Sequence, residues 1–325
     1  MTTKNSVLAL FENNRGRYVS GEFISKQLNV TRNAVWKAVR ELVKNGYRIQ
    51  AITNKGYFFY DDNDILSVQG ISPFLSAVEY SDRIHVFNSL ESTNITAKEL
   101  AASGAEHGAV VIADSQTAGR GRFDRSFFSP PGHGIYMSFI LHPTKLWSDA
   151  PTIITSFAAV AVCRAIEALT DKSPQIKWVN DVFLSGKKIC GILTEAVTDF
   201  ESGNVQWAVS GIGINFSAPK TVLPEELRHV IGAIFTEETP TITRNQLTAE
   251  VINQMMSFGS LDNIKEILKE YKRRLFMLGG KVQVISLTES YEAIALDIDD
   301  IGRLIVKKTT GEVVSLSTGE ISVRA

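Results

Sequence analysis

The sequence predicts an α+β protein in which a small helical N-terminal part precedes a larger body built on a mostly antiparallel sheet. The first sixty residues hold ten Lys and Arg but only three Asp and Glu, although the whole chain has a net charge of -1. Strand-like and helix-like segments mix from about residue 83, and the last fifty residues alternate like strands joined by polar or glycine turns. We therefore expect four segments: 1–63, a linker at 64–82, 83–272 and 273–325.

The segment "GEFISKQLNVTRNAVWKAVRELVKNGY" predicts two helices joined by a tight turn. Thr31 suits the N-cap of the second helix and Gly46 suits its end. The apolar stripe of that helix is Val35, Val39 and Leu42. The following "YRIQAITNKGYFFY" alternates around a hairpin signal at residues 54–56. This order is typical of a winged helix-turn-helix, and a small helical adaptor is the alternative.

The basic charge of this segment, set on an acidic body, indicates that it binds nucleic acid or another polyanion. The second helix and the hairpin would present side chains that reach bases or phosphates, namely Thr31, Arg32, Asn33, Trp36, Lys37, Arg40 and Lys55. A partly packed Trp36 is the alternative for that residue. Because a single half-site reader binds weakly, we expect a homodimer on palindromic operator DNA.

The central segment predicts strands and helices in a mixed order. "RIHVFNSL" reads as a strand, and "STNITAKELAASG" reads as a short helix with Ser92 or Thr93 as its cap. "GAVVIADSQ" and "GIYMSFIL" are strands on either side of a loop, and "APTIITSFAAVAVCRAIEALT" is a long apolar helix. "QIKWVNDVFLSGKKICGILTEAV" and "VQWAVSGIGINF" look like adjacent strands, and the glycines of "GIGIN" indicate close packing.

Positive charge gathers on the loop "QTAGRGRFDRSFFSPPG" at residues 116–132, which also carries glycine and proline. Glycine lets such a loop move and approach a ligand closely, and arginine keeps its charge. Farther on, Lys177 and Asp181 would point to one face of a strand, and Lys188 directly precedes an apolar strand. A simple Lys177–Asp181 pair is the alternative. Several cations and one carboxylate beside a mobile loop suit nucleotidyl transfer, in which a substrate carboxylate attacks the α-phosphorus of ATP.

Four stretches in this order, "GRGRFDRSFFSPPGHGIYMSF", "KWVND", "GKKICGIL" and "GIGINF", resemble the biotin protein ligase family. With the winged helix, the chain resembles the bifunctional type that also represses biotin genes. The resemblance implies ATP-dependent formation of biotinyl-5'-AMP and transfer of biotin to a lysine of biotin carboxyl carrier protein. It also implies a repressor whose dimer is promoted by biotinyl-AMP, and an SH3-like C-terminal barrel.

The resemblance also implies roles for single residues. Ser92, Thr93 and Asn94 match the motif that meets the ureido ring of biotin. The loop that closes over biotin and phosphate would contribute Gln116, Gly119, Arg120, Gly121 and Arg122.

The catalytic group implied by the resemblance is Lys188, Arg122, Lys177 and Asp181. Lys188 would reach the biotin carboxylate and the α-phosphate, and Asp181 would bind Mg²⁺ or orient the incoming lysine. The nucleotide side would be lined by Arg125, Phe127, Lys177 and Asn215.

The chain departs from the family pattern at three positions. Val179 replaces a usual proline, Phe127 replaces a usual tryptophan, and Leu223 stands where an adenine-stacking residue often lies. We expect the reaction to be retained with weaker nucleotide affinity, which Phe127→Trp would change. Glu320 and Arg324 are candidates to touch the active site, with structural pairing as the alternative, and Phe123 is a candidate for the dimer surface.

Cys163 and Cys190 lie far apart without partner motifs, so we expect buried thiols, no zinc and no redox cofactor. The chain begins without a long apolar run, so we expect a cytoplasmic protein with no membrane partner. A biotin-sensing repressor without ligase activity is the alternative function, but retention of the charged residues argues against it. A lipoate-ligase-type enzyme fits the motifs less well.

Overall fold

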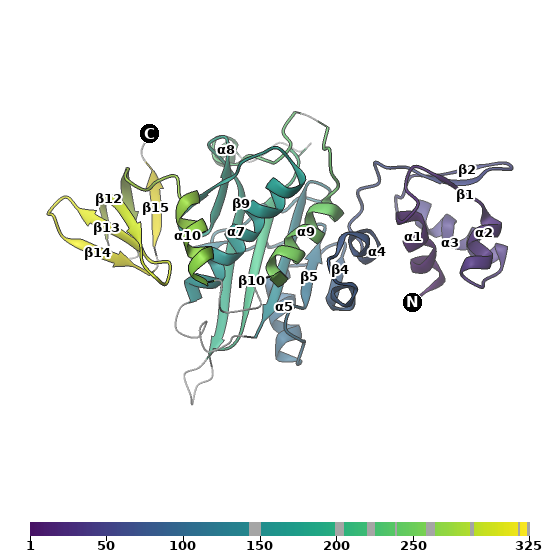
Figure 1. Cartoon of the computed structure of the whole chain (residues 1–325), viewed down its shortest axis with the longest axis horizontal. Helices are drawn as coiled ribbons and strands as arrows, with labels where there is room; N and C mark the ends of the chain where they lie inside the picture. Colours follow the sequence, from purple (N-terminus) through teal and green to yellow (C-terminus); the bar gives the residue numbers. More distant parts are fainter. Residues whose placement is uncertain are drawn as a thin grey trace. The chain divides into compact units, whose positions relative to one another are not determined.

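The computed structural model describes residues 1–142, 151–198, 205–219, 225–237, 239–257, 264–286, 289–317 and 319–323. The chain forms two compact units. The first comprises Met1–Asp82 and Ile242–Glu250, and the second comprises Arg83–Thr241 and Val251–Ala325. The elements of both are labelled in Figure 1.

The first unit has the predicted winged helix-turn-helix architecture. Its helices are α1 (Thr3–Glu12), α2 (Gly21–Gln27) and α3 (Arg32–Lys44). Its three-stranded sheet has the order β1 (Tyr18–Val19), β3 (Gly56–Phe59), β2 (Ile49–Ile52). α1 was not predicted, although Val7, Leu8 and Phe11 form an apolar stripe that is buried in this unit's core.

Local signals set the boundaries of α3 and of the hairpin. The Thr31 hydroxyl accepts a hydrogen bond from the Ala34 amide at 3.1 Å, as an N-cap should. The predicted stripe of α3 is buried, and Gly46 ends the helix with φ +94°. Gly56 has φ +100°, and a Cβ there would lie 2.3 Å from the Val19 carbonyl oxygen, so the turn requires glycine.

The segment predicted as a linker is tied to the start of α9 (Arg244–Ser257). The Arg244 amide and Nε donate to the Asp64 carboxylate at 2.6 and 2.8 Å. Asn245 accepts from the Ser67 amide at 3.1 Å and donates to the Ile65 carbonyl at 2.9 Å. The same segment contains α4 (Val68–Ile71), η1 (Ser72–Phe74) and η2 (Val78–Arg83). Arg244 and Asn245 are buried, so residues 64–67 cover these two polar side chains and hydrogen-bond to them.

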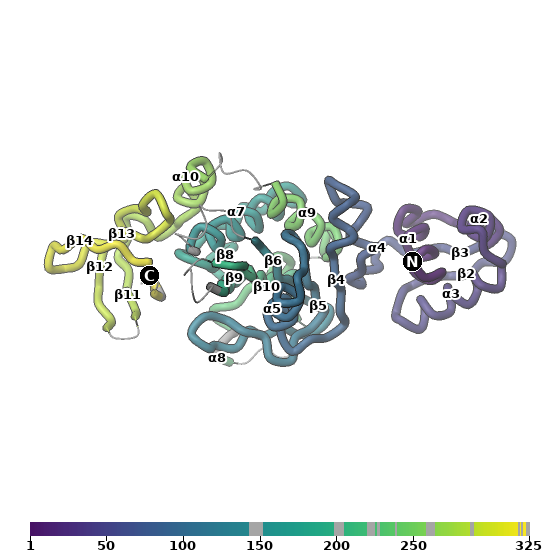
Figure 2. Tube along the Cα trace, turned by 90° about the horizontal axis from the view of Figure 1, so that it is seen from below, coloured from purple at the N-terminus to yellow at the C-terminus, as the bar shows by residue number. Residues whose placement is uncertain are grey.

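The second unit is built on a seven-stranded sheet, seen nearly along its strands in Figure 2. Its strands, in spatial order, are β4 (Ile84–Phe87), β5 (Val110–Ala113), β6 (Gly134–Leu141), β10 (Val205–Asn215), β9 (Lys187–Thr198), β8 (Asp181–Leu184) and β7 (Gln175–Lys177). Of the described pairings in this sheet, β4 with β5 is parallel and the others are antiparallel. The predicted mostly antiparallel sheet is therefore confirmed.

Helices cover both faces of this sheet. On β10, Gly211 faces Asn94 of α5 (Thr93–Ala102). The preceding residue, Ser210, lies beside Thr194. The Thr194 hydroxyl accepts a hydrogen bond from Thr155 of α7 (Pro151–Leu169). Successive residues of a strand point to opposite faces, so α5 and α7 cover different faces. α10 (Ile264–Arg274) packs on α7, and α8 (Glu225–Arg228) is one turn. The stretch Thr152–Leu169 is long and apolar enough to cross a membrane, but 72% of it is buried, as expected for a core helix.

The prediction that Lys177 and Asp181 lie along one strand is wrong. The chain turns between them, so Lys177 ends β7, Asp181 begins β8, and the two residues are paired across a hairpin. Opposed residues of an antiparallel pair point to the same face of the sheet. Lys177 and Asp181 therefore share a face, as predicted, but they do so because they are paired across the hairpin. The sequence analysis missed this turn because its residues, 178–180, include neither glycine nor proline.

The C-terminal part of the second unit is a separate five-stranded antiparallel sheet of order β14-β13-β12-β11-β15. The strands are β11 (Lys281–Ile285), β12 (Ser290–Ile298), β13 (Leu304–Lys308), β14 (Val313–Leu316) and β15 (Glu320–Val323). Cys163 and Cys190 are buried free thiols, as predicted.

Candidate active site

A cavity of about 440 Å³ lies on the α5 face of the seven-stranded sheet. It brings together all but one of the residues predicted for the small-molecule site. They are Ser92, Thr93, Asn94, Gln116, Arg120, Gly121, Arg122, Arg125, Phe127, Lys177, Asp181, Lys188 and Asn215. The exception, Gly119, is buried behind the lining, where a Cβ would lie 2.5 Å from the Phe127 carbonyl oxygen. Their roles stay predictions, but their convergence is a property of the fold.

One end of the cavity is lined by short neutral side chains at the start of α5. The Thr93 amide donates to Gln116 Oε1 at 2.8 Å, and Gln116 Nε2 donates to the Ser129 hydroxyl at 2.9 Å. The Ser138 hydroxyl donates to Asn94 Oδ1 at 2.7 Å. Thr93, Asn94 and Ser138 are almost fully buried, so this end is a preorganised array of donors and acceptors without net charge.

Beneath Asn94 is a carboxylate that the sequence analysis did not select. Glu195 of β9 accepts from Asn94 Nδ2 at 2.8 Å and from Lys98 Nζ at 2.7 Å. Burial by itself raises the pKa of Glu195, but the hydrogen bonds from Lys98 and Asn94, with the charges of Lys98 and Arg120, hold that pKa below its usual value. Glu195 is therefore ionised at neutral pH.

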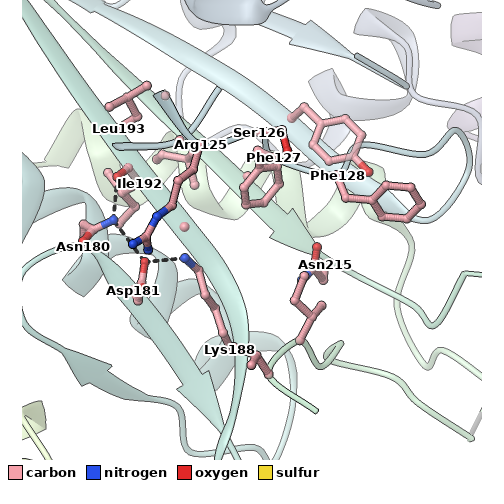
Figure 3. Close-up of a pocket in the computed structure, with 18 of the residues that line it drawn as sticks. Arg125, Ser126, Phe127, Phe128, Asn180, Asp181, Lys188, Ile192, Leu193 and Asn215 are labelled. Atoms are coloured by element: carbon pink, nitrogen blue, oxygen red, sulfur yellow. Dashed lines mark hydrogen bonds and ion pairs between the residues drawn. The ribbon is translucent and has the colours of Figure 1, made fainter. Parts of the chain in front are cut away.

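The other end of the cavity holds a chain of charged and amide groups (Figure 3). Lys188 Nζ lies 2.7 Å from Asp181 Oδ1, and Asn180 Nδ2 donates to the same oxygen at 3.0 Å. Arg122 Nη1 donates to Asn180 Oδ1 at 3.2 Å and to the Gly319 carbonyl at 3.1 Å. Asp181 thus pairs with Lys188, which corrects the alternative in which it pairs with Lys177; the Lys177 ammonium lies 5.8 Å from the centre of the Phe183 ring.

The hairpin turn that carries Asn180 is anchored on both sides. Trp178 Nε1 donates to the Gly302 carbonyl at 3.0 Å, and the Tyr271 hydroxyl donates to the Val179 carbonyl at 2.9 Å. Both Trp178 and Val179 are buried. Valine in place of the family's proline therefore leaves a turn that tertiary contacts hold in place.

Glycines on β9 and β10 form the floor of the cavity. A Cβ at Gly213 would lie 2.5 Å from the Phe127 ring, and one at Gly191 would lie 3.1 Å from the same ring. The Phe127 ring also packs edge-on against Tyr136, with centroids 6.3 Å apart. The predicted close packing at "GIGIN" is therefore packing of side chains onto the strand.

The arginine loop folds back on itself. The Phe127 amide donates to the Gly119 carbonyl at 2.8 Å, and the Gly121 amide donates to the Arg125 carbonyl at 2.7 Å. In Figure 3 the Arg125 side chain extends toward Asn180 and Asp181. Phe123, at the tip, is 46% exposed with φ +56°. The loop closes one wall of the cavity, and the half-exposed Phe123 at its tip is among the lining residues.

Sequence reasoning missed Asn180, Ser138 and Glu195. Asn180 was within "KWVND" and could have been found there, whereas Ser138 and Glu195 are polar residues inside apolar strands, a weaker signal. Leu223 and Arg324 lie outside the described residues, and so does the side chain of Glu320. Ile321, one residue farther along β15, lines the cavity.

The predicted nucleic-acid residues lie on the surface of the first unit. Exposed side chains include Thr31, Arg32, Asn33, Trp36, Lys37, Arg40 and Lys55. Arg40 stacks on the Trp36 ring at 4.8 Å, and Trp36 is 45% exposed, so it belongs to the surface of α3. Arg32 pairs with Glu22 at 2.6 Å. The surface of α3 thus offers four cations, Arg32, Lys37, Arg40 and Lys44, and one aromatic ring.

The described residues contain no group of three or more His, Cys, Asp or Glu side chains that could hold a metal ion. Mg²⁺ is commonly bound by one or two carboxylates together with substrate phosphates. Asp181 fits that pattern as a single carboxylate facing the cavity, so most of the ligands of such an ion would come from the nucleotide.

Comparison with known proteins agrees with this arrangement. Residues 86–215 match the biotin/lipoate A/B protein ligase family, 3–58 match an HTH domain, and 277–324 match the biotin protein ligase C-terminal domain. The chain is 33% identical over 317 residues to the bifunctional ligase/repressor BirA of Bacillus subtilis, covering 95% of both chains. It is 25% identical over 328 residues to BirA of Escherichia coli. The biotin protein ligase from Aquifex aeolicus in complex with biotin and ATP superposes with a TM-score of 0.62 at 23% identity, over 74% of this chain and 98% of that one, and shows the shared fold.

Proposed function

Because the chain belongs to the family of bifunctional biotin ligase/repressors, we propose that it activates biotin with ATP to biotinyl-5'-AMP and transfers the biotinyl group to a carrier-protein lysine. It further acts as a biotin-responsive repressor through the winged helix-turn-helix. The observation that carries the ligase proposal is one cavity with a neutral polar end and a cationic end. Biotin has the same asymmetry, with an uncharged ureido ring at one end and a carboxylate at the other.

The neutral end receives the ureido ring. Thr93, Asn94 and Gln116 are fixed by their mutual contacts and by Ser138, so they need little reorganisation when the ring enters. The carboxylate of biotin is then directed toward Lys188 and the arginine loop.

The cationic end performs the chemistry. The biotin carboxylate attacks the α-phosphorus of ATP, the bond to the β-phosphate oxygen breaks, and pyrophosphate leaves. Arg122 and Lys188 stabilise the negative charge on the phosphoryl oxygens, because both are held in place before the substrates enter. Loss of one such donor typically raises the barrier by roughly 2.7–4 kcal/mol. Asp181 would hold a Mg²⁺ ion together with the ATP phosphates, and that ion would supply additional charge neutralisation.

Transfer consumes the mixed anhydride. A neutral carrier lysine attacks the biotinyl carbonyl carbon, an amide forms, and AMP leaves. Asp181 is near this point of the cavity and is held by Asn180 and Lys188, so it is placed to orient the incoming amine or accept its proton. The alternative, a repressor without ligase activity, would not require this arrangement of Arg122, Asn180, Asp181 and Lys188.

The test is incubation of the purified chain with biotin, ATP, Mg²⁺ and a biotin-acceptor domain, followed by intact mass spectrometry of the acceptor. We expect a gain of one biotinyl group, lost in Lys188→Met. Lys269→Met is the matched control, because that lysine is 79% exposed and pairs with Glu266 on the surface of α10. An acceptor of unchanged mass, with biotin still bound to the protein, would refute the ligase activity.

Repression is tested separately by DNA binding. We propose a cytoplasmic homodimer on operator DNA, promoted by biotinyl-AMP, with Lys37, Arg40 and Lys55 contacting DNA. Alanine at Lys37 should weaken operator binding and reduce its salt dependence, because each phosphate contact releases counterions. Lys26→Ala, on α2 and paired with Glu22, is the control. Binding unaffected by biotinyl-AMP would refute the regulatory proposal while leaving the ligase intact.

A further inference from the structure

We propose that Glu195 and Lys98 are positioning residues that lock the Asn94 amide so that it presents only its carbonyl oxygen to the ligand. The proposal rests on the proposed function, because the ligand group that would meet this oxygen is a ring N–H of the ureido group of biotin. It adds two residues, outside the cavity lining, that determine which hydrogen-bonding pattern the site accepts.

The orientation of the Asn94 amide follows from its partners. Nδ2 faces the Leu193 carbonyl at 3.2 Å and Glu195 Oε2 at 2.8 Å, which both accept. Oδ1 faces the Ser138 hydroxyl at 2.7 Å. Exchange of oxygen and nitrogen would place an oxygen against two acceptors, so the arrangement has one orientation. Both N–H donors are occupied, and one lone pair of Oδ1 remains.

Glu195 is the charged acceptor that fixes the orientation of the Asn94 amide. Its two oxygens are divided, with Oε2 on Asn94 and Oε1 on Lys98 at 2.7 Å. Lys98 lies four residues after Asn94 on α5, so both donors come from the same face of that helix. Lys98 keeps the carboxylate ionised and turned toward Asn94, and a charged acceptor binds an amide more strongly than a neutral one.

The strand β10 also restricts the position of the Asn94 amide. A Cβ at Gly211 would lie 2.1 Å from Asn94 Oδ1, so the amide occupies space that only glycine leaves open. The site is therefore selective for a ligand that brings a donor to this point, and a ligand bringing only an acceptor would face an oxygen.

The test is biotin binding by the full-length protein, measured by isothermal titration calorimetry without nucleotide. We expect Glu195→Gln and Lys98→Met each to weaken biotin binding about tenfold, the order of one charge-assisted hydrogen bond. The turnover rate at saturating biotin should change less than about twofold, because a ground-state positioning defect appears mainly in KM. Glu106→Gln is the matched control, a 74% exposed carboxylate paired with Arg83.

An exchanged pair separates positioning from general stability. Asn94→Asp alone should abolish measurable binding, because two carboxylates then face each other. Adding Glu195→Gln restores a donor–acceptor contact of opposite polarity, while the carboxylate introduced by Asn94→Asp still offers an oxygen to the ligand. Binding by the double variant should therefore become measurable again.

The outcomes distinguish the positioning role of Glu195 and Lys98 from the proposed function itself. If the unmodified protein does not bind biotin, the proposed function itself fails. If it binds biotin but Glu195→Gln and Lys98→Met bind equally well, or the exchanged pair is no better than Asn94→Asp, the positioning role is refuted and the proposed function stands. Lys98→Met keeps the test decisive if Glu195→Gln does not fold.

Discussion

Replacing Gly213 by alanine should displace Phe127 from the floor of the cavity. The added methyl carbon would lie 2.5 and 2.6 Å from two carbons of the ring. Gly213 cannot move away, because β10 is paired with β6 on one side and β9 on the other at this residue. The ring must therefore rotate, although the Phe127 backbone stays bonded to Gly119.

The cost of this change can be estimated from two contributions. Overpacking of a filled site costs about 1–3 kcal/mol. Loss of the edge-on contact between Phe127 and Tyr136 adds about 0.5–1.5 kcal/mol. We expect the free energy of unfolding to fall by about 1.5–4.5 kcal/mol, measured by urea denaturation, and ATP affinity to fall with it, measured by calorimetry.

A double variant tests the cause. Leucine at position 127 lacks the two ring carbons that the new methyl group would meet, so Gly213→Ala/Phe127→Leu should be at least about 1 kcal/mol more stable than the sum of the single changes. Gly21→Ala is the control, since its Cβ would meet only Tyr57 at an ordinary 3.4 Å. Strictly additive single changes would refute the steric explanation.

Three further predictions concern other parts of the chain. Thr31→Ala removes the N-cap of α3 and should destabilise the first unit by about 1 kcal/mol in urea denaturation, whereas Thr31→Ser should not; equal stability of both would contradict the capping role. Burial raises the pKa of Glu12 despite the hydrogen bond and charge of Arg15. Protonated Glu12 therefore contributes stability to the folded protein at pH values below its ordinary pKa of 4.5. This stability is lost as the pH rises through the higher pKa of the folded state. Glu12→Gln should therefore flatten the fall in Tm as pH rises from the ordinary pKa of 4.5 toward neutrality, and a parallel pair of Tm curves would refute this. Burial raises the pKa of Cys163 to about 12 and raises the pKa of Cys190 above its usual value. A thiol reagent at about pH 8 should therefore label neither cysteine until the protein is denatured. Rapid labelling of the native protein would show that the thiols are accessible.

Local features of the fold that depend only on neighbouring residues could be predicted from the sequence. The Thr31 cap, the end of α3 at Gly46 and the hairpin at Gly56 each follow from two or three adjacent residues, and each is confirmed. α1 was missed although its apolar stripe is visible in the sequence, and α9 and α10 were not predicted.

The candidate site was harder to predict because its contacts join distant segments. The cationic residues were identified by motif, but the pairing of Asp181 with Lys188 depends on a hairpin whose turn has no glycine or proline. Glu195 lies 101 residues from Asn94, so only the register of β9 beside β10 shows that they meet. The segment boundaries and the role of each site residue stay predictions.

The tie between residues 64–67 and the start of α9 limits how freely the DNA-binding part can be lost in evolution. A descendant that kept only the ligase part and began at residue 83 would lose the hydrogen bonds that the buried Arg244 and Asn245 make to residues 64–67. Loss of hydrogen bonds to buried polar groups is costly, so such a chain would be less stable unless both positions also changed. A descendant that began at about residue 64 would keep the cover and lose only the winged helix. The shortest ligase that keeps these hydrogen bonds would therefore begin within the segment that the sequence presents as a linker.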